Sequence, residues 1–136
     1  MTFTANGNPG ALPLIGRILV ATIFIIAGLG KLAAPGPTQG HIASVGLPLP
    51  SLAYVVAILV ELGGGLLLLV GYRTRIVAAV LAVFCVVTAL VFHHALADRN
   101  QMIHFLKNLA MAGGLLQFVA FGPGRIGWDS RAGTSA

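Results

Sequence analysis

The chain of 136 residues is 57% hydrophobic and only 8% charged, with a mean hydropathy of +0.96, whereas a soluble domain carries about 25% charged residues. This composition excludes an ordinary water-soluble domain. The net charge of +5 comes from basic residues that are scattered rather than gathered in a stripe, which excludes a nucleic-acid interface, and a single cysteine, Cys85, excludes internal disulfides and dithiol chemistry.

Four apolar runs follow one another along the chain, and each has the length of about 20 residues that crosses a hydrocarbon core of about 30 Å. They predict transmembrane helices over residues 11–31, 51–70, 75–96 and 102–121. The predicted fold class is therefore all-α, an integral membrane four-helix bundle. Residues 1–136 form one domain, and we expect flexible tails at 1–10 and 122–136.

Polar breaks separate these runs. The first break, from Ala33 to Pro50, is dense in proline and glycine, which interrupt helices, so we expect the longest loop here, with His41 in it. The second, from Gly71 to Arg75, is a tight turn that joins two helices into a hairpin, and the third runs from Ala97 to Gln101.

The basic residues predict the orientation in the membrane. An even number of spans places both termini on one side. That side carries more basic residues, Arg73, Arg75, Arg125 and Arg131, than the other, which has Lys31 and Arg99, with Lys107 just inside the fourth run. The positive-inside rule then predicts that both termini are cytoplasmic.

Ionisable side chains lie inside the predicted spans, where each costs about 2.5 to 3.5 kcal/mol on insertion scales. Glu61 is the deepest, roughly 15 Å from either surface at about 1.5 Å per residue. Arg17 enters from the terminal side and Lys107 from the opposite side, so either could reach Glu61 if the helices adjoin. Two interpretations remain open: charge pairs that fix helix packing, and a ligand or proton site built on Glu61.

A second polar group is expected at the end away from the termini. His93 shares a helical face with small residues and should point into the bundle, near His104, Lys107 and Asn108 of the fourth run. Such donors suit the carbonyls of a quinone in an apolar slot. Two facing histidines could also ligate haem iron or another metal, but no second matched pair or acidic cluster accompanies them, so we expect no metal site and no intrinsic cofactor.

Short motifs are spread from about Leu14 to Asp129. They are Gly16-Arg17-Ile18-Leu19, Phe24–Leu32, Val45-Gly46-Leu47-Pro48, Glu61–Leu66, Gly71–Arg75, Lys107-Asn108-Leu109-Ala110, and Gly122–Arg125 with Asp129. Their order resembles the DoxX family of small four-helix membrane proteins. The positions that match the polar motifs of the family are Arg17, Lys31, Glu61, Lys107 and Asn108. The resemblance implies a prokaryotic inner-membrane protein associated with quinone-linked oxidation or oxidative-stress complexes.

These observations lead to one main hypothesis and two alternatives. The main hypothesis is a redox-associated subunit that binds a quinone or another small apolar molecule among Glu61, His93, His104, Lys107 and Asn108, with Arg17 and Lys31 as buried charge partners. Redox centres would come from a partner protein, membrane-bound or peripheral, and the chain could also form a homo-oligomer. The alternatives are a non-enzymatic scaffold or assembly factor, and an oligomeric small-molecule transporter or channel.

Overall fold

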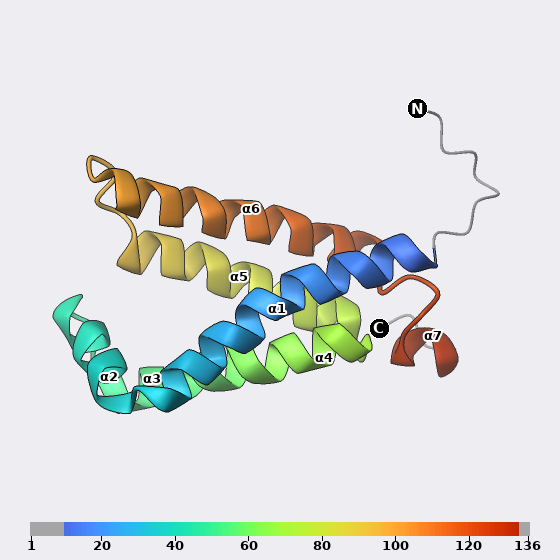
Figure 1. The fold of residues 1–136 in the computed structure, drawn as a ribbon, viewed down its shortest axis with the longest axis horizontal. Helices are drawn as coiled ribbons and strands as arrows, with labels where there is room; N and C mark the ends of the chain where they lie inside the picture. The colour runs from blue at the N-terminus through green and yellow to red at the C-terminus, as the bar shows by residue number, and fades with distance from the viewer. Residues whose placement is uncertain (1–9, 134–136) are drawn as a thin grey trace.

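The computed structural model describes residues 10–133. Within these residues four helical spans are long and apolar enough to cross a membrane. They are α1 (Ala11–Ala33), the continuous span formed by α3 (Pro50–Ile58), the π-helical segment η1 (Leu59–Gly63) and α4 (Gly64–Val70), then α5 (Thr74–Phe92) and α6 (Arg99–Phe121). The predicted all-α, four-span fold is confirmed, and both described chain ends lie at the same end of the bundle (Figure 1).

The buried core lies in the half of the bundle near the termini. α1 packs against η1 and α4, while α5 runs alongside α6. Between them lies a core of fully buried side chains, among them Ala21, Leu68, Leu81, Cys85 and Leu115. Toward the other end the α1–α3 pair diverges from the α5–α6 pair (Figure 1). A cavity lies between these two helix pairs.

The expected long loop contains a helix, α2 (Pro35–Ser44), at the end of the bundle away from the termini. Pro35 starts the helix, where a missing backbone N–H costs nothing because that group has no partner inside the helix. Ile42 is the buried side chain of α2. The proline-rich composition therefore marks the start of a short helix rather than an irregular loop.

Two other helix boundaries differ from the prediction. α5 ends at Phe92, before residue 96, because His93 leaves the helical region at φ −128° and ψ 35°. α6 begins at Arg99, before residue 102, because the Asp98 side chain accepts hydrogen bonds from the N–H groups of Asn100 and Gln101 at 2.8 and 3.2 Å. Such an N-cap satisfies backbone donors that the first turn leaves unpaired.

The C-terminal segment also differs from the expected flexible tail, since residues 122–133 fold back onto the bundle and contain α7 (Trp128–Arg131). Asp129 is buried, and its two carboxylate oxygens accept hydrogen bonds from the N–H groups of Arg73 and Thr74, each at 2.8 Å. These groups begin α5, so the tail caps that helix. The expected tails at 1–9 and 134–136 lie outside the described residues.

Gly28 allows the close approach of α1 to η1. A Cβ atom at this position would lie 2.9 Å from Cβ and 3.1 Å from the backbone nitrogen of Leu62. We expect Gly28→Ala to destabilise the protein by about 1 to 3 kcal/mol, because one helix would have to move away from the other. Denaturant unfolding in detergent micelles measures this change.

Gly30, two residues further along α1, supplies the matched control. A Cβ atom there meets nothing within 4 Å. Gly30→Ala should therefore be neutral or stabilising by up to about 1 kcal/mol through helix propensity. Equal losses of stability in the two variants would show that the contact with Leu62 is not what limits the size of residue 28.

Candidate functional site

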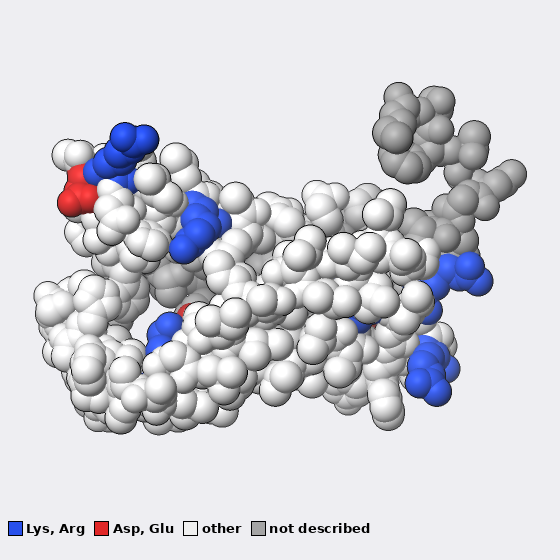
Figure 2. All heavy atoms as spheres, in the orientation of Figure 1, with Lys and Arg blue, Asp and Glu red and all other residues white. Residues whose placement is uncertain are grey.

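A cavity of about 500 Å³ lies at the end of the bundle away from the termini. α1, α2, α3, α5 and α6 all contribute to its walls, which are mostly apolar and include Phe24, Val56, Phe84, Val91 and Phe92. Figure 2 shows a hollow at this end, with a basic and an acidic side chain visible inside it.

All five residues predicted to bind a ligand line this cavity: Glu61, His93, His104, Lys107 and Asn108. Lys31 lines it as well, and so does His41 from α2. Arg17, the other predicted charge partner, lies elsewhere. The structure thus brings together side chains from helices that are far apart in the sequence.

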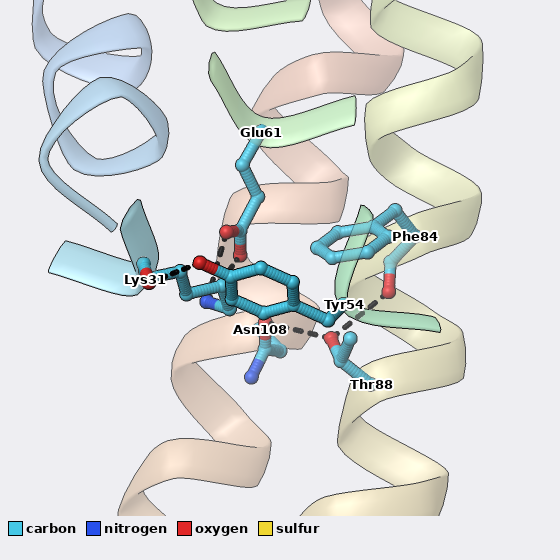
Figure 3. A network of polar contacts seen from close by, with 6 residues as sticks. All are labelled: Lys31, Tyr54, Glu61, Phe84, Thr88 and Asn108. Carbon is cyan, nitrogen blue, oxygen red and sulfur yellow. Dashed lines mark hydrogen bonds and ion pairs between the residues drawn. The ribbon is translucent and has the colours of Figure 1, made fainter. Parts of the chain in front are cut away.

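The deep part of the cavity holds an ion pair between Lys31 and Glu61 (Figure 3). The Lys31 Nζ donates a hydrogen bond to Glu61 Oε1 at 3.0 Å and lies 2.8 Å from Oε2. The Tyr54 hydroxyl donates to the backbone oxygen of Lys31 at 2.8 Å, which joins the end of α1 to α3. Glu61 lies in the π-helical segment, a local irregularity that is frequent at functional sites.

Arg17 does not reach Glu61, so the predicted contact between them is wrong. Its guanidinium donates instead to the backbone oxygens of Leu68 at 3.3 Å, Leu69 at 3.1 Å and Ile126, and it interacts electrostatically with Asp129. Leu68 is seven residues beyond Glu61, about 10 Å along a helix. Because α1 runs antiparallel to α4, Arg17 lies at the depth of Leu68, near the termini.

Lys107 lines the same cavity as Glu61, but among residues 10–133 the salt bridge of Glu61 is made with Lys31. The sequence therefore identified the carboxylate and included Lys31 among its charge partners, but it did not distinguish Lys31 from Arg17 and Lys107 as the cation beside Glu61. Lys31 was predicted as a buried charge partner, and the structure shows that its partner is Glu61. The extension of α1 to Ala33 keeps Lys31 inside the helix and directs it at Glu61.

Thr88 and Asn108 connect α5 to α6 beside the ion pair (Figure 3). Thr88 Oγ1 lies 2.9 Å from the backbone oxygen of Phe84 and 3.4 Å from Asn108 Oδ1, and Asn108 Nδ2 donates to the His104 backbone oxygen at 3.0 Å. Sequence reasoning missed Thr88, which is one hydroxyl in an apolar run. Its only signal is that it lies on the same helical face as Phe84 and the buried Cys85.

Aromatic stacking marks the mouth of the cavity. The rings of His93 and His104 stack with centroids 5.0 Å apart, and the ring of His41 stacks on Phe92 at 5.4 Å. His93 Nδ1 lies 3.1 Å from Gln101 Oε1. His41 thus links α2 to α5 across the opening.

His93 lies just beyond the end of α5. Burial lowers the pKa of His93 below its ordinary value, and His104, Lys107 and His41 lower it further, while the hydrogen bond with Gln101 acts in the opposite direction. The imidazole is therefore neutral near pH 7 and offers one donor and one acceptor.

The stacked histidines are poorly arranged for a shared metal ion. Their ring planes differ by 26°, so the nitrogen lone pairs, which lie in those planes, do not converge on one point. In the part of the chain that the structure describes, no group of three His, Cys, Asp or Glu side chains is placed to hold a metal. The donor set suits polar groups of an organic molecule better.

Comparison with known proteins identifies the family of this chain and several relatives. The family model described as DoxX matches residues 12–94, which include Lys31 and Glu61. The chain is 40% identical over 116 residues to the inner membrane protein YqjF of Escherichia coli (strain K12), covering 85% of this chain and 88% of the relative. It is 37% identical over 123 residues to the inner membrane protein YphA of the same strain, covering 87% and 88%.

A shorter match joins the chain to a Bacillus subtilis (strain 168) protein named "Putative oxidoreductase CatD". The two are 39% identical over 69 residues, which are 51% of this chain and 50% of the relative. No solved structure matches the chain.

Proposed function

The chain belongs to the DoxX family and is a multi-pass inner-membrane protein, and we propose that it is a redox-associated subunit that binds a quinone or a similar small apolar molecule. The observation that carries the proposal is the cavity, in which a buried Lys31–Glu61 pair lies at the deep end of apolar walls. The printed name of the Bacillus subtilis relative, "Putative oxidoreductase CatD", supports a redox role.

The cavity fits a quinone in size and in chemistry. Its volume of about 500 Å³ lies within the range of about 300 to 1,000 Å³ that is usual for small-molecule sites. Lys31 offers a donor at the deep end, Lys107 and His104 offer donors nearer the mouth, and Phe84 and Phe92 lie among the apolar walls. When bound, a quinone would supply two-electron redox chemistry, and this chain's residues would bind it and orient its two carbonyl groups.

The redox centre that exchanges electrons with the quinone would come from a partner protein. The chain has a single cysteine, Cys85, which is buried in the core, so a dithiol relay within the chain is not available. A membrane or peripheral redox protein docked on the bundle would supply the redox centre, and a second copy of the chain could complete the assembly.

We also propose that the termini face the cytoplasm, so that the cavity opens toward the outer leaflet. Arg73, Arg75, Arg125 and Arg131 lie at the terminal end of the bundle, and basic residues are enriched in cytoplasmic segments. Because Cys85 is buried, thiol labelling of the Arg125→Cys or Arg99→Cys variant reports on the introduced cysteine. A membrane-impermeant thiol reagent applied to intact cells should label the Arg99→Cys variant and leave the Arg125→Cys variant unlabelled; the reverse pattern contradicts the orientation.

Quinone titration of the protein in lipid nanodiscs tests the binding proposal. The wild type should bind saturably. Lys107→Met should weaken binding by about tenfold, because it removes one charged hydrogen-bond donor, and Glu61→Gln should weaken it by a similar factor, because it removes the ion pair that positions the Lys31 donor. Arg125→Gln is the matched control, since this exposed residue lies at the opposite end of the bundle and should not change affinity.

Two results would contradict the proposal. Equal affinity in the wild type, Glu61→Gln and Lys107→Met would show that binding occurs outside the cavity. An absence of saturable binding, together with loss of a co-purifying complex in Glu61→Gln, would favour the scaffold alternative, in which the same charges only fix helix packing.

A further inference from the structure

Lys107 lines the cavity, but no acidic side chain of the protein is left to pair with it. The sequence has three acidic residues, and all of them lie within residues 10–133. Glu61 pairs with Lys31. Asp98 caps the first turn of α6, and Asp129 lies at the opposite end of the bundle, where it caps α5. Within the described part of the chain, Lys107 is therefore a cation without an anionic partner.

The position of Lys107 makes an unpaired charge costly. Lys107 lies eight residues beyond Arg99, the first residue of α6, and thus about 12 Å along the helix from it. Ionisable side chains at such depth usually face the interior of a bundle or a cavity, where they meet a partner or a substrate. Lys107 is exposed and lines the cavity, so a bound molecule can reach its ammonium group.

The charge of Lys107 acts at the mouth of the cavity. His104 and Lys107 lie three residues apart on the face of α6 that lines the cavity. The charge of Lys107 also contributes to lowering the pKa of His93, so it acts across the opening on the residue that follows α5. Two lysines and one carboxylate line the cavity, and with the histidines counted as neutral its walls carry one excess positive charge.

We propose that the cavity takes an amphiphilic ligand with a single negative charge, so that among quinone-type molecules it prefers those with an ionised hydroxyl group on the ring. The anionic oxygen accepts hydrogen bonds from Lys107 and from a ring N–H of His104, and the ring lies between the apolar walls. The proposal rests on the proposed function and names the substrate class of the same site.

The two lysines of the cavity offer different environments to such a ligand. The ammonium of Lys31 lies 2.8 Å from the Glu61 carboxylate (Figure 3), which repels a second anion and offsets the attraction of Lys31. Lys107 has no carboxylate beside it, and a hydrogen bond between two ionised groups is about twice as strong as one between neutral groups. The anionic group of the ligand therefore lies at the mouth, and a neutral carbonyl faces the deep end.

The experiment compares two probes with the same ring in phosphatidylcholine nanodiscs at neutral pH. The probes are a short-chain naphthoquinone with a hydroxyl group on the quinone ring, and the methyl ether of that compound. The hydroxyl group is conjugated to a carbonyl, as in a carboxylic acid, so the first probe is an anion and the ether is neutral. Calorimetry, corrected for partitioning of each probe into protein-free nanodiscs, should show that the wild type binds the anion about tenfold more tightly.

Two variants locate the preference. Lys107→Met should abolish it, because both probes then meet an uncharged mouth. Arg99→Gln is the matched control, since it removes an exposed cation from the start of the same helix, and Arg99 does not line the cavity. This control should keep the tenfold preference. A preference that persists in Lys107→Met, or that is lost in Arg99→Gln, would overturn the assignment to Lys107.

The outcomes separate this inference from the proposed function. If the wild type binds both probes saturably with equal affinity, water or lipid phosphate neutralises Lys107 and the preference for an anion is overturned, while quinone binding stands. If neither probe binds saturably, the proposed function fails and this inference fails with it. The comparison between probes needs only the wild-type protein, so it holds even where Lys107→Met does not fold.

Discussion

Replacing Lys31 by Met should destabilise the protein by about 3 kcal/mol, because it leaves the Glu61 carboxylate buried without its cation. The Glu61 side chain is 8% exposed and lies at the deep end of the cavity, so it cannot turn out to water. The estimate is at the low end of the usual range, since the Lys31 side chain itself is 28% exposed. Denaturant unfolding in detergent micelles measures the loss.

Removing the carboxylate should cost less than removing the cation. In Glu61→Gln the ammonium of Lys31 stays partly exposed and keeps contact with water in the cavity. The double variant Lys31→Met with Glu61→Gln has no buried charge and should recover most of the stability that Lys31→Met loses. A double variant less stable than Lys31→Met would contradict the ion-pair interpretation.

Replacing Arg17 by Leu should destabilise the protein at least as much as Lys31→Met does, with an expected loss of about 3 to 5 kcal/mol in the free energy of unfolding. Arg17 is 1% exposed, and its guanidinium bonds backbone oxygens on both α4, at Leu68 and Leu69, and the C-terminal segment, at Ile126. The change leaves these buried acceptors unpaired and removes the cation that interacts with Asp129.

The geometry of Arg17 also predicts that lysine cannot replace it. The guanidinium donates from Nη1 to α4 and from Nη2 to Ile126. A single ammonium nitrogen cannot reach both groups of acceptors in this geometry. Arg17→Lys should therefore be clearly destabilised, whereas Arg125→Gln, at an exposed arginine of the same end, should unfold like the wild type. Thermal unfolding in micelles compares the three proteins. An Arg17→Lys variant as stable as the wild type would show that the two-sided hydrogen bonding of the guanidinium is not required.

The two buried charge systems have different consequences for the site. Arg17 and Asp129 fasten the C-terminal segment and the start of α5 at the terminal end, where the core is tightly packed. Lys31 and Glu61 lie at the cavity, where the helix pairs diverge. Arg17 variants should thus lower stability without a selective change in ligand affinity, while Glu61 variants should alter affinity.

Hydropathy and residue type were enough to predict the membrane class, the four spans and the polar residues whose burial needs an explanation. Hydropathy and charge cost are properties of a segment and of a residue type, so they can be read without knowing which helices are neighbours. The same reasoning identified Glu61, His93, His104, Lys107 and Asn108, which all line the cavity.

The pairing of the buried charges, in contrast, follows from the packing of the helices. The partner of a buried side chain depends on the depth and rotation of each helix against its neighbours, and these follow from contacts such as that of Gly28 with Leu62. Arg17 was therefore a candidate partner of Glu61 on sequence grounds but bonds α4 and Ile126, and Lys31 lies beside Glu61. α2 and the cap formed by Asp129 were missed for the same physical reason, because tertiary contacts to the bundle fold segments whose local composition indicates only loop and tail.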